Sequence, residues 1–174
     1  MFGYFSSFSS YFSKPPEPVS EPTLESKLPD SVVKQTVLSM KQFKPTSDSI
    51  VVIGDVDALD TLWKNSSTYI TPFCSNCKSS KAQAKFINSK KDMIKNDVKI
   101  PPQPYIDDYS KPYSLEFTNG RNRFANLRDS GIKEIPILIE KSQIDKFKEH
   151  DVIIRMVAGK RQPKRKHQTR RKPK

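Results

Sequence analysis

The sequence predicts a small α/β domain, because short apolar strands alternate with helical patterns along the chain. Residues 50–53 and 135–139 are continuous apolar runs of the kind found in buried strands. Residues 81–96 place apolar side chains at helical spacing, and residues 115–130 read as a strand, a turn and a helix. These observations indicate one sheet-containing domain of modest size.

Residues 115–140 carry the clearest boundaries. A strand ends at Phe117, a polar turn covers 118–119, a helix runs from about 120 to 130, and a second strand spans 135–139. Asn119 is suited to cap the helix, Gly131 is placed where helices end through a left-handed residue, and Pro136 is tolerated near a strand start. The spacing turns Phe124, Leu127 and Ile132 toward the sheet, and Arg121, Asn122 and Arg128 away from it.

The remaining elements lie on either side. A strand begins at Ser49, and Asp55 or Asp57 caps a helix that extends to Lys64. Residues 68–73 are a candidate strand, residues 142–149 a helix capped by Ser142, and residues 152–157 a last strand. The helix at 81–96 has a basic face that could follow a nucleic-acid backbone or simply be solvated, formed by Lys81, Lys85, Lys90, Lys91 and Lys95.

The start of the helix at residue 120 is a predicted anion site. The first backbone N–H groups of a helix have no partner within it, and the helix dipole favours negative charge there. Arg121 and Arg123 fall in this first turn, so phosphate is the natural ligand. The alternative is that the arginines are solvated, or pair with Glu116 and Asp129.

These residues resemble a known family. The run Gly120-Arg121-Asn122-Arg123-Phe124-Ala125, followed by Arg128, Gly131 and Ile135-Pro136, is similar to the box of the ParB/sulfiredoxin superfamily, and most similar to its ParB-like nuclease and plasmid fertility-inhibition branch. The resemblance implies a mixed-sheet ParB/sulfiredoxin-like domain in which Gly120, Arg121, Asn122 and Arg123 contact phosphate.

Two positions depart from the family pattern. The catalytic cysteine of sulfiredoxins is replaced by Arg121, which excludes sulfinic-acid reduction. A frequent histidine is replaced by Asn122, and asparagine cannot serve as a general base near neutral pH. Both departures favour binding over catalysis.

Three acidic residues are candidates for a metal site or a base. Asp107 and Asp108 are adjacent in a predicted loop, and Glu116 lies in the strand before the motif. Carboxylates of this kind could hold Mg²⁺ opposite the arginine-rich turn, with a nucleotide as second ligand. The alternative is a solvated turn.

The charge of the chain is concentrated at its C-terminal end. The net charge is +12, and residues 160–174 contain nine basic residues and no acid. Such a tail binds phosphate backbones by releasing counterions, and a nuclear address signal is the other interpretation. Its candidate nucleic-acid contacts are Lys160, Arg161, Lys164, Arg165, Lys166, Arg170, Arg171 and Lys172.

The N-terminal region differs in composition from the rest. Residues 1–12 alternate Phe and Tyr with Ser and Gly, and residues 14–30 are rich in Pro, Glu and Ser. We predict a disordered arm over 1–45, the ParB/sulfiredoxin-like domain over 46–158 and a basic tail over 159–174. Residues 32–43 could add a short helix to the arm, and its aromatic end could bind a protein or a membrane surface.

Apolar runs and cysteines in the sequence bear on where the protein is located in the cell. No run of 18 apolar residues is present, so no transmembrane segment is expected, nor is a secretory signal. Cys74 and Cys77 form a single pair without the four ligands that zinc needs, and we expect two ordinary thiols in a reducing compartment; redox exchange is the alternative. The expected location is cytoplasmic or nucleic-acid-associated, in a nucleus or a virion.

The sequence therefore predicts a nucleic-acid or nucleotide phosphate-binding protein, whose enzymatic form would be a nuclease or a nucleoside triphosphatase. The alternative is a non-catalytic packaging or interaction protein, viral or plasmid-borne, that acts through its basic tail.

Overall fold

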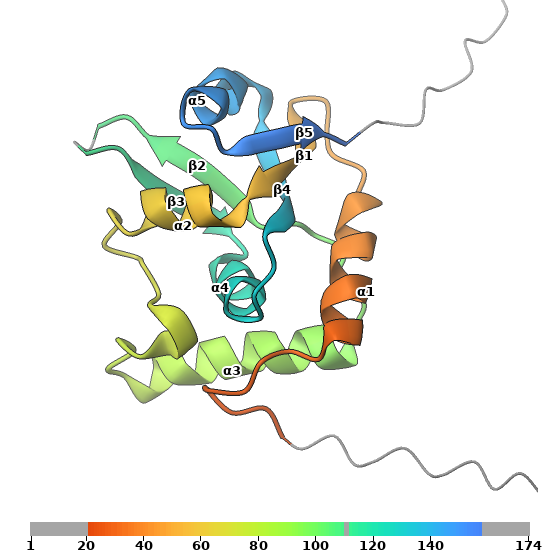
Figure 1. Cartoon of the computed structure of the whole chain (residues 1–174), viewed down its shortest axis with the longest axis vertical. Coiled ribbons are helices and arrows are strands. Elements are labelled where there is room, and N and C mark those ends of the chain that lie inside the picture. Colours follow the sequence, from red (N-terminus) through yellow and green to blue (C-terminus); the bar gives the residue numbers. More distant parts are fainter. Residues whose placement is uncertain (1–20, 110–111, 158–174) are drawn as a thin grey trace, which may run out of the picture.

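The predicted α/β class is confirmed. The computed structural model describes residues 21–109 and 112–157; the aromatic segment at residues 1–12 and the basic residues from 160 onward lie outside them. Within the described residues, helices surround two small antiparallel sheets (Figure 1). In this part of the chain no helix is long and apolar enough to cross a membrane.

The central strand is β1 (Ser49–Asp55), which has four consecutive buried residues. It pairs antiparallel with β4 (Glu134–Glu140) on one side and with β5 (Ile153–Met156) on the other. Pro136 lies opposite Ile53 in β4. Because β4 is at the edge of this sheet, the missing N–H of Pro136 costs no bond to a further strand.

The second sheet is a hairpin of β2 (Gln103–Asp107) and β3 (Ser114–Asn119). It meets the edge of β4 through a backbone hydrogen bond of 2.9 Å from the Leu138 N–H to the Pro102 carbonyl. Pro101, Pro102 and Pro104 lack N–H donors, so this segment cannot form a continuous ladder with β4. The paired strands are accordingly antiparallel in two separate sheets, where a mixed sheet was expected.

Five α-helices are described: α1 (Asp30–Lys41), α2 (Val56–Trp63), α3 (Ser80–Lys95), α4 (Arg121–Asp129) and α5 (Ile144–Glu149). The predicted cap of α2 is confirmed, since the Asp55 carboxylate accepts a 2.8 Å hydrogen bond from the Ala58 N–H. The predicted strand at 68–73 is wrong: this segment contains a loop and enters the 3₁₀ turn η1 (Pro72–Cys74). Ser142 does not cap α5, because it lies in the 3₁₀ turn η2 (Lys141–Gln143) and donates to Glu140.

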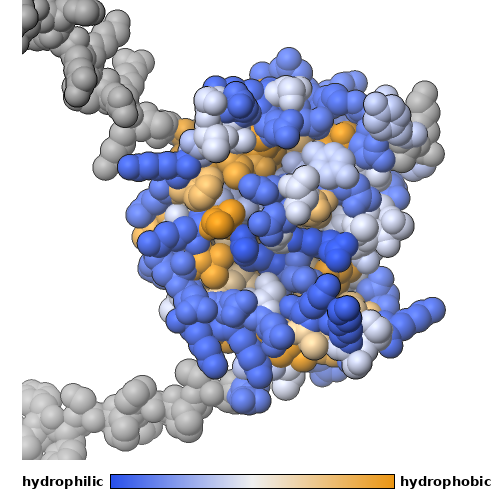
Figure 2. Space-filling view, turned by 180° about the vertical axis from the view of Figure 1, so that it is seen from behind, coloured by the Kyte–Doolittle hydropathy of each residue, from blue (hydrophilic) through white to orange (hydrophobic). Residues whose placement is uncertain are grey.

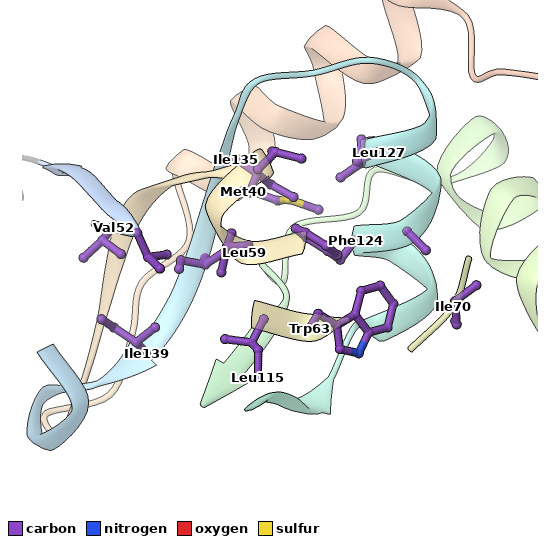
Figure 3. Packing of buried hydrophobic residues seen from close by; sticks show 14 of the residues in the cluster. Met40, Val52, Leu59, Trp63, Ile70, Leu115, Phe124, Leu127, Ile135 and Ile139 are labelled. Carbon is purple, nitrogen blue, oxygen red and sulfur yellow. The ribbon is translucent and has the colours of Figure 1, made fainter. Parts of the chain in front are cut away.

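The core lies between α2, α4 and the two sheets (Figure 3). Trp63, fully buried, is at its centre and makes edge-on contacts with Tyr69, Phe117 and Phe124 at ring distances of 5.1 to 5.6 Å. Aromatic pairs of this geometry add about 1 kcal/mol each beyond area burial. Phe124 anchors α4 in the core by packing on Trp63 and Phe117. This contact fixes the orientation of α4, including its first turn, relative to the two sheets.

Part of the predicted N-terminal arm belongs to the packed structure. Leu28, Val33 and Met40 are buried in the core, and α1 packs beside β4. The extended segment before α1 crosses α3, where the buried Lys90 ammonium donates to the carbonyls of Thr23, Leu24 and Ser26 at 2.5 to 3.2 Å. Packing therefore begins well before residue 46, and the short helix considered for residues 32–43 is present as α1.

Candidate phosphate-binding site

The site begins at the turn between β3 and α4. The predicted cap is wrong: Asn119 is still part of β3, opposite Gln103, and the residue preceding the helix is Gly120. Gly120 has a left-handed backbone, with φ of 78°, which residues other than glycine rarely adopt. A Cβ at this position would lie 2.8 Å from Cα of Pro102, so the close approach of the two segments also requires glycine.

The first turn of α4 leaves backbone donors free. The first hydrogen bond of the helix is from the Phe124 N–H to the Gly120 carbonyl, at 2.9 Å, so the N–H groups of residues 121–123 have no acceptor in the helix. The turn contains no acidic side chain. An anion is therefore favoured here by both the free donors and the helix dipole.

Arg123 is held in place by the segment before β2. Its Nη1 donates to the carbonyl of Ile100, which leaves other guanidinium donors for a ligand. Burial lowers the pKa of the Arg123 guanidinium, an effect that nearby Asp92 opposes. The group keeps its positive charge at neutral pH, since an arginine pKa lies far above it.

A polar cleft of about 490 Å³ opens between α3 and the start of α4. Asn122 and Arg123 line it from α4, and α3 together with Asn96, the residue that follows it, supplies further polar side chains: Lys85, Asn88, Ser89, Asp92 and Asn96. Lys85 is exposed and makes no ion pair with another described residue, so its charge is available to a ligand. The cleft thus combines two cations, three carboxamides and one carboxylate.

The lysine face predicted for α3 is only partly present. Lys81, Lys85 and Lys95 are exposed and Lys91 is half-buried, but Lys90 is 2% exposed and turned toward the N-terminal segment. Burial lowers the pKa of the Lys90 ammonium. The helical spacing predicts Lys90 on the basic face, because no sequence feature indicates the three carbonyls that bind it.

Arg121 and Arg128 differ in their surroundings: Arg121 has no partner among the described residues, whereas Arg128 is held in ion pairs. Arg121 is half-exposed and has no hydrogen-bond or ion-pair partner among the described residues. Arg128, expected to face away from the sheet, is 9% exposed; it lies 2.6 Å from Asp60 and donates to Asp129 at 2.9 Å. Trp63 and Tyr69 flank its guanidinium at 5.6 Å. Arg128 is therefore a structural ion-pair residue at the far end of α4.

The structure does not bring the three acidic candidates to the arginine turn. Asp107 pairs with Ser114 at the opposite end of the hairpin from Asn119, about 13 Å away at the usual rise of a strand. Asp108 bonds Lys146, and the Glu116 carboxylate accepts hydrogen bonds from Ser66 and Thr68. No group of three potential metal ligands is found in residues 21–109 and 112–157. The acid that does line the cleft is Asp92, which no local pattern in the sequence marks as a site residue.

Cys74 and Cys77 are joined by a disulfide, where two ordinary thiols were expected. The bond closes a short loop at the C-terminal end of α4, far along the helix from Gly120. The tail that begins at Lys160 lies outside the described residues.

Known proteins resemble this chain in fold but not in sequence. No family model matches the chain, and no curated protein matches it in sequence. Among solved structures, the oncogenic suppression activity protein, a plasmid fertility inhibition factor studied as its gold(I) cyanide derivative, superposes with a TM-score of 0.50 at 14% identity. The match covers 65% of this chain and 61% of that protein, so the chain spans less than two thirds of its neighbour's length. At this identity the likeness shows the fold alone, a small domain of helices and sheets.

Proposed function

We propose that the cleft between α3 and the start of α4 binds the phosphate of a nucleotide or a nucleic-acid strand. The observation that carries the proposal is convergence: Lys85 on α3 and Asn122 and Arg123 in the first turn of α4 line one cleft, although they come from two helices. Two cations beside a helix N-terminus favour an anion.

Carboxamides support a ligand larger than phosphate alone. Asn88 on α3, Asn96 just after α3 and Asn122 on α4 each offer a donor and an acceptor. Such groups can hydrogen-bond a sugar or a base edge as well as a phosphate oxygen. In this role Asn122 serves binding, which agrees with its inability to act as a base.

Catalysis, if present, would depend on Asp92. Among residues 21–109 and 112–157 it is the one carboxylate that lines the cleft, and the predicted acids Asp107, Asp108 and Glu116 are engaged elsewhere. Nuclease or triphosphatase activity would therefore require Asp92 as a base or as a ligand of Mg²⁺.

The test compares two lysines of one helix. In the full chain, Lys85→Ala removes a charge from the cleft, whereas Lys81→Ala removes the same charge one turn away outside it. We expect Lys85→Ala to weaken binding of labelled ATP, CTP and single-stranded DNA about 5- to 10-fold, as for one lost charge-assisted contact. Lys81→Ala should change it less than twofold. Equal effects of the two variants would refute a specific cleft.

A second pair of measurements separates binding from hydrolysis. Asp92→Asn keeps the shape of the side chain and removes its negative charge. If the cleft only binds, the variant should hold phosphate more tightly, because a repulsive charge is lost. If the cleft hydrolyses its ligand with Mg²⁺ present, product formation should disappear.

The alternative function rests on the charge of the tail. Nine basic residues in 160–174 account for most of the net charge of +12. A full chain with these nine residues changed to Gln would lose all binding if the tail alone acts, and Lys85→Ala would then have no effect in the unaltered chain. That result would assign the domain to a scaffold for a nucleic-acid-associated packaging protein.

A further inference from the structure

The Cys74–Cys77 disulfide lies in a loop that packs against the C-terminal end of α4. The loop from residue 70 to 77 contacts the last turn of α4 through two polar bonds. The Phe73 N–H donates to the Asp129 carboxylate at 2.8 Å, and Arg128 donates to the Ile70 carbonyl at 2.8 Å. α4 also packs directly on the 3₁₀ turn that contains Cys74.

The backbone of this loop is constrained next to the disulfide. Phe73 and Cys74 are consecutive non-glycine residues with left-handed backbones, at φ of 55° and 56°. Such conformations are unfavourable for residues with a Cβ and persist only where the surroundings impose them. The covalent bond from Cys74 to Cys77 is one such constraint, because it fixes the position of Cys74 directly.

The Asp129 carboxylate depends on this conformation. It is 5% exposed, and its hydrogen-bond donors among the described residues are Arg128 and the Phe73 N–H. If the turn at Phe73 and Cys74 relaxed, the Phe73 N–H would no longer be held against α4 and the buried carboxylate would lose one donor. Loss of a donor to a buried charge weakens the packing of the segment that carries it.

We infer that the Cys74–Cys77 disulfide is a redox-controlled lock on the C-terminal end of α4, opened by a dithiol reductant. Cys77 is the less buried of the two residues, while Cys74 is 2% exposed, so a thiolate reaches the Cys77 sulfur first. The attack forms a mixed disulfide with Cys77, and the Cys74 sulfur leaves as a thiolate that takes up a proton.

The second thiol of the reductant then completes the exchange. Its thiolate attacks the reductant sulfur of the mixed disulfide, the Cys77 sulfur leaves, and it too is protonated. Two electrons and two protons pass to the protein, and the dithiol becomes a disulfide. With the cross-link gone, Phe73 and Cys74 are free to adopt ordinary backbone conformations, which releases the hydrogen bond to Asp129.

The inference is independent of the phosphate cleft and needs no ligand for its test. The full chain is prepared oxidised and after treatment with dithiothreitol, and free thiols are counted in each. Amide hydrogen exchange is then measured segment by segment. We expect no free thiol in the oxidised form, two in the reduced form, and exchange at least ~5-fold faster on reduction in residues 70–77 and 126–131 only.

Cys77→Ser supplies the matched control, because it cannot form the bond while Cys74 stays in the core. Its exchange should equal that of the reduced wild type and should not respond to dithiothreitol. Thr71 and Asn76 also bond each other across the loop, with the Asn76 N–H donating to Thr71 at 2.8 Å. If these bonds suffice, exchange will be unchanged on reduction and the inference fails. It also fails if thiols remain free after oxidation, or if β1 and β4 accelerate as much as α4.

Discussion

At the scale of single residues, a glycine is needed either for a left-handed backbone or for lack of space, and Gly120 and Gly131 allow the two effects to be compared. Both have left-handed backbones, but a Cβ at Gly120 meets Pro102 at 2.8 Å and one at Gly131 meets nothing within 4 Å. We expect Gly120→Ala to lower the free energy of unfolding by about 3 kcal/mol and Gly131→Ala by about 1 kcal/mol. Urea unfolding of both variants measures the difference, and equal losses would show that the contact with Pro102 relaxes at no cost.

Arg128 is the most consequential charged residue of the core. Arg128→Met leaves Asp129, which is 5% exposed, without its ion-pair partner, and leaves Asp60, which is 14% exposed, paired with Lys64 at 3.3 Å. Breaking a buried pair in this way costs about 3 to 5 kcal/mol. Arg155→Met breaks an exposed pair with Glu134 and should leave the free energy of unfolding almost unchanged, which makes it the control for loss of an arginine.

The same variant predicts a dependence on pH. Burial raises the pKa of the Asp129 carboxyl even though Arg128 and the Phe73 N–H oppose the shift, so without Arg128 the pKa rises further. A group whose pKa is higher in the folded chain stabilises the fold as pH falls. The deficit of Arg128→Met relative to wild type should therefore shrink between about pH 7 and about pH 5. A constant or growing deficit in urea unfolding would contradict this assignment.

At the scale of elements, Lys90 joins α3 to the segment that precedes α1. All three of its N–H donors are used by backbone carbonyls. Lys90→Met keeps the length of the side chain but removes these donors, so we expect faster amide exchange in residues 24–33 and a loss of about 2 to 3 kcal/mol. Lys95→Met, exposed and on the same helix, should leave both unchanged.

The elements that sequence could predict are those with local determinants. The apolar run of β1, the Asp55 cap of α2 and the exit of α4 at Gly131 all follow from a few neighbouring residues. The errors involve distant partners. Asn119 is taken into β3 by pairing with Gln103, and the predicted strand at 68–73 is held as a loop by Asp129 and Arg128.

In the candidate site, too, the residues with local determinants were predictable and those that depend on distant packing were not. Gly120 and Arg123 were identified from the helix start, which is a local pattern. Lys85, Asn88 and Asp92 were not assigned to the site as a group, because only the packing of α3 on α4 brings them there. The acids Asp107, Asp108 and Glu116 were near in sequence but are separated from the turn by the length of the hairpin.

At the scale of the whole molecule, domain and tail should differ in their response to salt. The surface seen in Figure 2 is largely hydrophilic, and the described residues carry both signs of charge. Binding through the tail should weaken steeply, with a slope of roughly −0.7 per neutralised phosphate for single strands in a plot of log affinity against log salt. Changing the nine basic residues of 160–174 to Gln should flatten this slope without abolishing the effect of Lys85→Ala. An unchanged slope would show that the tail does not contact the strand.

The order of strands has a consequence for how the protein folds during its synthesis. β1 is made early, yet Ser49 pairs with Glu140 and Val52 pairs with Met156. The hairpin of β2 and β3 closes between near neighbours, whereas β1 must wait for both of its partners. Four buried residues of β1 therefore stay exposed until the chain beyond residue 156 has left the ribosome, and this interval is when the nascent protein most needs protection from aggregation.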